Sequence, residues 1–276
     1  ENFIIGSQVF LGGALQKILI ADNLSQYVDI IYKTPEIYSQ ISLWIAVFAY
    51  SVQIFCDFSG YSLMAIGIAR ILGFELPKNF DMPYNAQSIT EFWHRWHISL
   101  SLWLRDYLYI SLGGNRKGVF RTQLNMLITM LLGGLWHGAS WNFVIWGAFH
   151  GLALGINRFW SLYLHCSIEK IIGAKLYNIQ AWMITLIFVS LLWVPFRSPD
   201  TQTTIHFIQR LLFAHDGVLW YHTQTLIILI FVSVWHIIHH FNIVKLLSNF
   251  PVKGNQLNSY RVILVIMTSV YLLTLF

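Results

Sequence analysis

Apolar stretches with at most one charged residue each recur along this chain, and they constrain its fold more than any other feature. They cover residues 3–21, 41–55, 58–74, 123–135, 141–156, 181–196, 223–238 and 260–276. Charged residues make up only 11% of the 276 residues, whereas a soluble domain carries about 25%. Because so few charges cannot cover a soluble surface, the sequence predicts an integral membrane protein.

The apolar stretches read as helices rather than as strands of a barrel. Runs such as "TLIILIFVSV" lack the strict alternation of a transmembrane β-strand. A helix needs roughly 20 residues to span the hydrocarbon, and several stretches are shorter, which favours broken, tilted or re-entrant helices. We therefore expect an all-α polytopic bundle, with residues 1–276 forming a single transmembrane domain.

The net charge of +5 comes from basic residues beside the apolar stretches. These residues are Arg116, Lys117, Arg121, Arg158, Lys170, Lys175, Lys245, Lys253 and Arg261. Basic clusters at helix ends mark the cytoplasmic side of a membrane protein. We therefore expect the lipid bilayer, and no nucleic acid, as the partner of these charges.

Residues 75–122 are the least lipid-like part of the chain. Prolines and asparagines predict an irregular loop at its start, after which Ser88 or Thr90 can cap a helix with Glu91 in its first turn. Apolar and polar residues then mix from 92 to 112, where glycines end the pattern. The mixture of Trp, Tyr and Arg predicts an amphipathic segment that is interfacial or re-entrant.

Residues 123–156 predict a helical hairpin or a broken helix. Glycines and His137 interrupt an apolar run whose halves hold 13 and 16 residues, each too short for a comfortable span. Arg121 and Arg158 flank both outer ends, so the bend "WHGASWN" would lie at depth. Irregular backbone survives there only beside protein or a polar cavity, so we expect His137 to line a cavity.

Two histidines of this hairpin are candidates for chemistry, since an ionisable side chain at membrane depth is a functional hypothesis by default. His137 lies between glycines, with Trp136 and Trp141 as candidate pocket walls. A hydrogen-bonded packing role remains open for it. For His150, between small residues that permit close helix packing, we favour that packing role.

Other histidines occur at metal-ligand spacing. His94 and His97 share a helical face, but carboxylate or cysteine partners at metal-site spacing are absent nearby. His236, His239 and His240 follow at a helix end, where histidines commonly meet the interface. We favour positioning or interfacial roles for both groups and expect no metal site.

Asp57 is a carboxylate inside an apolar run. We expect it to pair with a basic side chain such as Arg95 or Arg105, or to mark a polar cavity. Arg105 and Asp106 are adjacent in sequence, and we expect them to point to different helix faces instead of neutralising each other.

Four motifs together resemble the membrane-bound O-acyltransferase family, in its bacterial polysaccharide branch. They are "ILIADNLS", "QIFCDFSGYSLMAIGIARILGFELPKNF", "SITEFWHRWHISLSLWLRDYLYISLGGNRKG" and "GLWHGASWNFVIWGAFHGL". The resemblance is dense over residues 10–160 and continues by hydropathy alone beyond them. It also implies further helices before residue 1, in a multi-pass protein of the bacterial inner membrane.

The resemblance implies roles for particular residues. His137, in Trp-His-Gly, matches the family's essential histidine, and His97, in Arg-Trp-His-Ile-Ser, matches the second prominent histidine of the branch. We expect substrate or donor contacts from motif residues near them, namely Trp136, Trp141, Asn142, Arg105, Asp106, Arg116 and Lys117.

The resemblance also implies acetyl-CoA as a cytoplasmic acyl donor, with no permanently bound cofactor. The acetyl group would travel toward hydroxyls of an exported, alginate-like polysaccharide, directly or through an extracytoplasmic acetyltransferase or secretion complex. A hydroxyl that attacks a thioester must lose its proton, and a neutral imidazole is a suitable base. Because no Ser or Cys beside a base is evident, we favour direct transfer.

Three alternatives remain open at this point. A related branch transfers D-alanine toward teichoic acid and shares the two histidine motifs. A transporter could use His137, His150 and Asp57 as a proton relay, although such folds show paired broken helices. A scaffold for a polysaccharide secretion complex is the third.

Overall fold

In a computed structural model that describes residues 1–213 and 215–240, the chain is built from helices. No β-strand occurs in these two ranges, which confirms the expected all-α class. Its residues divide into two compact units, Glu1–Asn79 with His215–Phe276 and Phe80–Ala214. Each unit is described by itself below, and the expectation of one domain stays a prediction.

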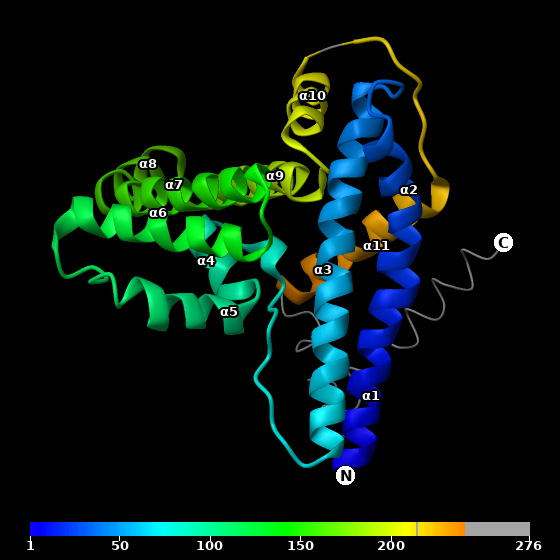
Figure 1. Cartoon of the computed structure of the whole chain (residues 1–276), viewed down its shortest axis with the longest axis horizontal. Coiled ribbons are helices and arrows are strands. Elements are labelled where there is room, and N and C mark those ends of the chain that lie inside the picture. Colours follow the sequence, from blue (N-terminus) through cyan, green and yellow to red (C-terminus); the bar gives the residue numbers. More distant parts are fainter. Residues whose placement is uncertain (214, 241–276) are drawn as a thin grey trace. The chain divides into compact units, whose positions relative to one another are not determined.

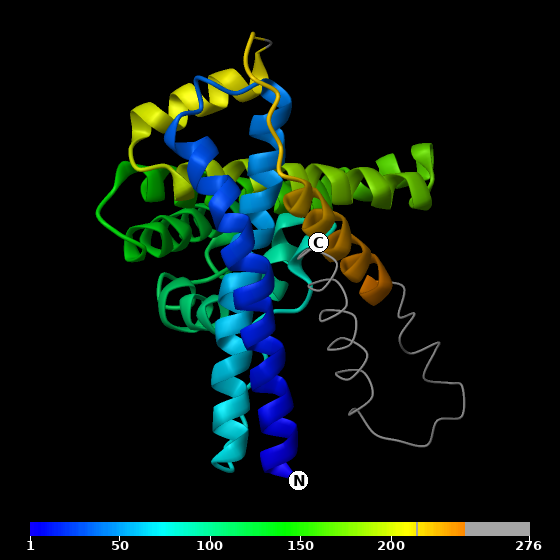
Figure 2. The same ribbon diagram turned by 90° about the vertical axis from the view of Figure 1, so that its right-hand side faces the viewer.

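The first unit contains a long helical hairpin, drawn in blue to cyan in Figures 1 and 2. Its elements are α1 (Asn2–Leu15), the π-helical turn η1 (Gln16–Ala21), α2 (Asp22–Lys33) and α3 (Gln40–Ile71). The first three form one continuous run of 32 residues. Since α3 is unbroken, the separate stretches 41–55 and 58–74 belong to one helix.

The two arms of this hairpin pack through facing glycines. Gly13 lies against the carbonyl of Gly60, so that a Cβ atom on Gly13 would collide with α3 backbone. Small residues at such a crossing let helix backbones approach closely, as is common in membranes. Gly6, Gly13, Gly60 and Gly67 therefore set the spacing of this hairpin.

Asp57 pairs with a basic residue that the sequence did not suggest. Lys17 Nζ, on η1, lies 2.6 Å from Asp57 Oδ1 and 2.7 Å from Asp22 Oδ1. The expected partners Arg95 and Arg105 are therefore wrong, although the expected ion pair exists. Lys17 and Asp57 lie on different arms of the hairpin, far apart in sequence, so no local pattern indicates that they pair.

Three helical segments are long and apolar enough to cross a membrane, among the residues that the structure describes. They are Asn2–Lys33, Gln40–Ile71 and Ala174–Arg197. The shorter apolar helix α11 (Thr223–His240) belongs to the first unit, where the His236 ring contacts Phe55. The stretch 260–276 and the basic residues 245, 253 and 261 lie outside the described residues.

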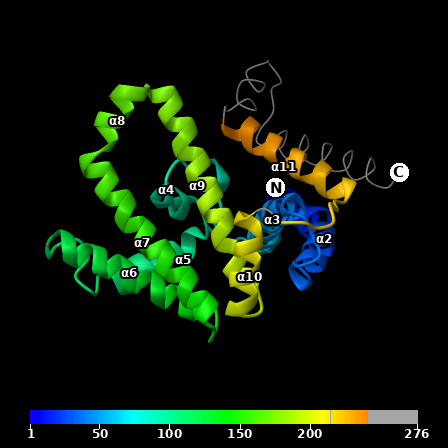
Figure 3. The ribbon, with the colours of Figure 1, turned by 90° about the horizontal axis from the view of Figure 1, so that it is seen from above.

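The second unit contains the expected hairpin around His137. Its main helices are α6 (Gly118–Trp136), α7 (Trp141–Tyr163), α8 (His165–Ile172), α9 (Ala174–Arg197) and α10 (Thr201–Leu212). Figure 3 shows α8 at the turn between α7 and α9. The hairpin itself is confirmed, but α6 and α7 hold 19 and 23 residues. Both helices continue beyond the apolar stretches, so the expectation of two short halves is wrong.

Glycines also hold α6 and α7 together. A Cβ atom on Gly147 would collide with the carbonyl of Met130, and one on Gly134 would collide with the carbonyl of Phe143. The α6 face that carries Gly134 and the α7 face that carries Gly147 are thereby packed directly against each other. The close packing expected around His150 is confirmed, since this residue is fully buried.

The amphipathic segment is three short helices instead of one. They are α4 (Ile89–Arg95), α5 (Ile98–Trp103) and the π-helical η3 (Leu104–Tyr109). Ser88 caps α4 as expected, because its hydroxyl accepts from the Glu91 N–H at 3.1 Å. Gly113 and Gly114, with φ of 108° and 55°, end the segment as expected.

Candidate active site

The break between α4 and α5 places His97. This residue has φ of 44°, a left-handed conformation that costs a non-glycine residue energy and is found mostly at functional sites. A continuous helix would put His97 on the same face as His94. Instead, the turn presents the His97 ring to Phe80, with ring centroids 6.5 Å apart.

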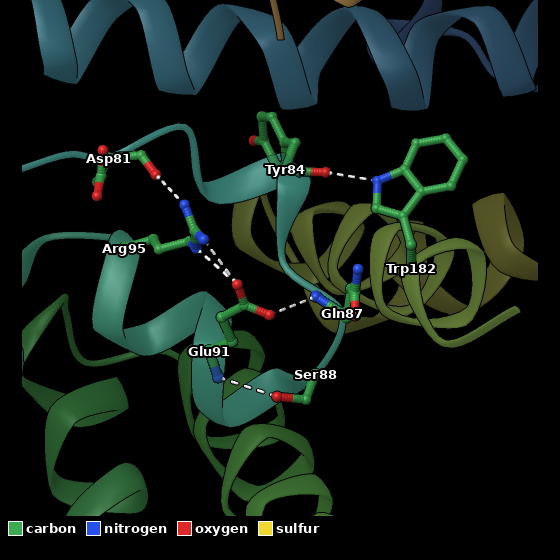
Figure 4. Close-up of polar contacts among 7 residues, drawn as sticks. All are labelled: Asp81, Tyr84, Gln87, Ser88, Glu91, Arg95 and Trp182. Atoms are coloured by element: carbon green, nitrogen blue, oxygen red, sulfur yellow. Dashed lines mark hydrogen bonds and ion pairs between the residues drawn. The ribbon is translucent and has the colours of Figure 1, made fainter. Parts of the chain in front are cut away.

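A polar network holds α4 in place (Figure 4). The Glu91 carboxylate accepts from the Gln87 N–H at 2.8 Å and pairs with Arg95 at 2.7 Å. The Arg95 guanidinium also donates to the carbonyl of Asp81 at 3.0 Å. These bonds tie the irregular loop before α4 to the helix that precedes His97.

Trp182 of α9 ties the same loop to the longer helices. Its indole N–H donates to the carbonyl of Tyr84 at 2.8 Å (Figure 4). In a second link, the Thr90 hydroxyl of α4 accepts a hydrogen bond from the Asn157 side-chain amide of α7, at 2.8 Å. The His97 turn is thus supported from both α7 and α9.

His137 directly follows α6, at the bend of the hairpin, and is half-buried among aromatic rings. Its ring centroid lies 5.0 Å from Trp136, 6.0 Å from Phe143, 5.4 Å from Trp146 and 5.0 Å from Phe196. These rings come from α6, α7 and the end of α9. The hairpin bend therefore places His137 against aromatic rings from three helices.

His97 and His137 lie close enough to interact electrostatically, and both are in connections between helices. Burial, and then the charge that His137 can carry, lowers the pKa of His97 to about 4. Burial also lowers the pKa of His137 from its usual 6.5. Since both pKa values lie below neutral, both imidazoles are uncharged near pH 7 and can accept a proton or a hydrogen bond.

His150 is fully buried on α7, one helical turn after Trp146. The Trp93 indole N–H donates to its Nδ1 atom at 3.3 Å. Its ring centroid lies 4.7 Å from that of Trp146. His150 therefore belongs to the same aromatic cluster as His137, joined to it through Trp146.

Of the two tryptophans expected as pocket walls, Trp136 contacts the His137 ring and Trp141 does not. Trp136 contacts His137 but is 65% exposed, and Trp141 is 74% exposed with no ring contact to His137. Trp146 and Phe196 also contact the His137 ring, and Trp193 stacks on Trp146. Trp146 stands at i, i+4 from His150, a spacing that could have identified it, whereas nothing local identifies the two α9 residues.

Asn142 holds two helices together. It is buried, its amide donates to the carbonyl of Ser198 at 3.0 Å, and its Oδ1 atom accepts from the Thr204 hydroxyl at 3.3 Å. A substrate that contacts Asn142, as the sequence predicts, would have to share a side-chain amide whose nitrogen and oxygen are both hydrogen-bonded already. In the structure, Asn142 holds the connection from α9 to α10, which follows Phe196, against α7.

Arg105 and Asp106 form an exposed pair, contrary to expectation. The guanidinium contacts both carboxylate oxygens, at 2.7 Å and 3.2 Å. Arg116 and Lys117 stand in the turn before α6, and their expected donor contacts stay a prediction.

Two nucleophile–base neighbours occur that the sequence did not suggest. The Ser99 hydroxyl lies 3.4 Å from His97 Nδ1, and Cys166 Sγ lies 3.8 Å from His165 Nδ1. The expectation that no Ser or Cys lies beside a base is therefore wrong. Ser99 is exposed and two residues from His97, so the contact is local to the turn.

A hollow of about 400 Å³ lies between α6 and α7. Its lining is almost entirely apolar and consists of Phe120, Gln123, Leu124, Leu127, Gly151, Leu152, Gly155, Ile156 and Phe159. None of the candidate histidines lines it. The chemistry-bearing residues thus gather at the hairpin bend, away from this hollow.

Comparison with known proteins places this arrangement in a family. The model of the "MBOAT, membrane-bound O-acyltransferase family" matches residues 1–194, which include both histidine motifs. The matched region also contains α9 up to Val194, beyond the span over which the motifs are dense.

Three named relatives align with between 41% and 74% of this chain. The probable alginate O-acetylase AlgI of Pseudomonas aeruginosa is 45% identical over 202 residues, which are 73% of this chain and 37% of the relative. The peptidoglycan O-acetyltransferase of Helicobacter pylori is 40% identical over 208 residues, 74% of this chain and 38% of the relative. The teichoic acid D-alanyltransferase of Bacillus subtilis is 33% identical over 122 residues, 41% of this chain and 30% of the relative. The chain thus spans less than two fifths of the length of these relatives.

Proposed function

The chain belongs to the membrane-bound O-acyltransferase family, and on that premise we propose that it is part of an acetyltransferase acting on an exported polysaccharide. The donor is acetyl-CoA on the cytoplasmic side of a bacterial inner membrane, which the whole protein crosses several times. The acceptor is a sugar hydroxyl on the other side, reached directly or through an extracytoplasmic partner. The similarity to an alginate O-acetylase and to a peptidoglycan O-acetyltransferase supports this acceptor class.

The position of His137 is the observation that carries the proposal. It stands in the Trp-His-Gly motif, at a hairpin bend, half-buried beside four aromatic rings and near His97. Its lowered pKa favours the neutral imidazole. A base for a hydroxyl needs this neutral form near pH 7.

In the proposed reaction, His137 accepts one proton and later releases it. The acceptor hydroxyl oxygen bonds to the thioester carbonyl carbon while its proton passes to the His137 imidazole. The carbon–sulfur bond then breaks, and the CoA thiolate receives the proton from the imidazolium. His97, whose neutral ring lies nearby, positions one of these groups.

Two basic residues are our candidates for binding the phosphates of the acyl donor, CoA. Arg116 and Lys117 lie in the exposed turn before α6, where two positive charges can bind the phosphates of CoA. The exposed Arg105–Asp106 pair precedes this turn. We place donor recognition on these residues and the chemistry at His137.

D-Alanyl transfer is a second candidate, because the teichoic acid D-alanyltransferase of Bacillus subtilis is 33% identical over 122 residues, which are 41% of this chain. It would use the same histidine with a different acyl group. The acyl group released from the product by mild base distinguishes the two candidates.

The test uses membranes that contain the full-length protein, supplied with acetyl-CoA labelled in the acetyl group. We expect wild type to place base-labile label on polysaccharide, and His137→Ala to reduce the turnover roughly 10²–10⁴-fold at an equal membrane level. His206→Ala is the matched control, since it removes the same ring from an exposed position on α10, outside the candidate site.

Each result has a definite meaning. Full activity of His137→Ala would overturn the assignment of the base. Transfer of D-alanine in place of acetyl would replace the donor and keep the site. Wild-type membranes that transfer neither group would favour a scaffold or a transporter.

A further inference from the structure

Three buried N–H groups in the aromatic cluster have no hydrogen-bond acceptor among the described residues. They are the indole Nε1 atoms of Trp146 and Trp193 and the Nε2 atom of His150. The three side chains are 2%, 1% and 0% exposed. Buried donors without acceptors are costly and rare in native proteins, so each requires an explanation.

The hydrogen bond from Trp93 determines which His150 nitrogen carries the proton. An indole nitrogen can only donate, and Trp93 Nε1 donates to His150 Nδ1 at 3.3 Å. Nδ1 must therefore offer its lone pair, and the neutral ring carries its proton on Nε2. His150 is thus presented as a donor at Nε2 and cannot serve as the base.

Trp146 connects these donors to the proposed base. Its ring centroid lies 4.7 Å from that of His150, 6.1 Å from that of Trp193 and 5.4 Å from that of His137. The Trp146 and Trp193 rings are stacked, 25° from parallel. One aromatic cluster therefore holds three unpaired donors next to a histidine that can accept a proton.

We propose that His150 Nε2–H, together with the indole N–H groups of Trp146 and Trp193, binds the carbonyl oxygen of the acyl group and stabilises the oxyanion of the transfer. The inference rests on the proposed function and adds a second part to the same site. Donors held rigidly where negative charge develops are the strongest single contribution in many acyl transfers.

The electrons of the step balance around these donors. As the acceptor oxygen bonds to the carbonyl carbon, its proton goes to His137 and the C=O pair moves onto the carbonyl oxygen. That oxyanion accepts from His150 and a neighbouring indole. It then re-forms C=O and expels the CoA thiolate, which takes the proton back from His137.

Two amide variants separate a donor role from a packing role. The side-chain amide of His150→Gln reaches the position of Nε2 and can donate there. The shorter amide of His150→Asn reaches the position of Nδ1, where it can accept from Trp93 but offers no donor at Nε2. Both replace the same buried ring and are measured in full-length protein at matched folded amounts.

We expect His150→Asn to lower kcat about 10²–10³-fold, the range for loss of one oxyanion donor, with little change in KM. His150→Gln is expected to recover at least ten-fold of that loss. A packing role would affect both variants alike. Equal kcat values for the two variants, or wild-type kcat in His150→Asn, would overturn the inference.

A second measurement does not depend on turnover. Acetyl-CoA labelled with ¹³C at the carbonyl carbon is bound to full-length protein without acceptor, and its C=O stretch is recorded by infrared difference spectroscopy. We expect a lowered frequency with wild type and His150→Gln, and a frequency closer to that of free acetyl-CoA with His150→Asn, which keeps only the indole donors. An unshifted band in wild type would overturn the inference.

The two proposals can fail separately. If wild type transfers no acyl group, the proposed function falls and takes this inference with it. If wild type transfers acetyl normally while the Gln and Asn variants behave alike, only the donor assignment falls. If wild type transfers D-alanine, the same pair of variants is compared on that activity.

Discussion

The hairpin of α1–α2 with α3 and the hairpin of α6 with α7 are both packed through glycines, at Gly13 in the first and at Gly147 in the second. They differ in what their polar side chains do. In the middle of the first hairpin, Lys17 is paired with two carboxylates, and the buried Ser59 hydroxyl donates to Gln16 at 2.7 Å.

Beside the second hairpin, three donors of one aromatic cluster are buried without acceptors next to two neutral histidines. Unpaired buried atoms also occur in the first unit, at Gln8 Oε1, Gln53 Oε1 and Arg70 Nε, three positions spread along α1 and α3. Paired polar groups stabilise a structure, whereas unpaired ones that are held rigidly are available to a substrate. The comparison thus separates a supporting hairpin from a reacting one.

The pH dependence of kcat tests the reacting side with the largest expected change. Burial lowers the pKa of His137 below its usual 6.5, and only the neutral imidazole accepts the proton. We therefore expect kcat to be constant above pH about 6.5 and to fall ten-fold per pH unit below the lowered pKa. An acid limb with its midpoint above the ordinary histidine value would contradict the burial of the base.

Removal of Lys17 tests the supporting side. Lys17→Met leaves Asp57 and Asp22 without their cation, and the paired side chains are 40% to 50% exposed. We expect a loss of about 1 kcal/mol of stability, the upper end for exposed ion pairs, seen as a lower thermal midpoint in detergent. Lys17→Arg should keep the midpoint. A fall of kcat per folded molecule in Lys17→Met would assign chemistry to this hairpin as well.

Ser99 gives the smallest expected change. Its hydroxyl lies 3.4 Å from His97 Nδ1, at the long end for a hydrogen bond. Direct transfer predicts that Ser99→Ala keeps kcat within about three-fold, since the loss of one weak hydrogen bond is worth roughly 0.5 kcal/mol. Abolished transfer, or acetyl label retained on wild type but absent from Ser99→Ala after denaturation, would show an acyl-serine instead.

Local patterns were sufficient for much of the fold. Long apolar stretches with few charged residues predicted membrane helices. The glycines around His137 predicted the hairpin, and Ser88 was correctly identified as a helix cap. These features depend on residues within a few positions of one another. Such local signals do not depend on the tertiary packing.

The missed features all depend on residues far apart in sequence or on unusual backbone. The left-handed turn at His97 interrupts a stretch whose side chains fit one continuous amphipathic helix. Lys17 meets Asp57 across two arms of a hairpin. Trp193 joins the histidine cluster from α9, and no periodicity of α7 could indicate that.

One pair of variants tests the division between the two hairpins most directly. Thermal midpoint and kcat per folded molecule are measured for His137→Ala and Lys17→Met in the same full-length protein. We predict that His137→Ala keeps the midpoint and loses roughly 10²–10⁴-fold in kcat, while Lys17→Met loses midpoint and keeps kcat. The reverse pattern, or a loss of both quantities in both variants, would contradict the assignment of the reaction to the His137 cluster.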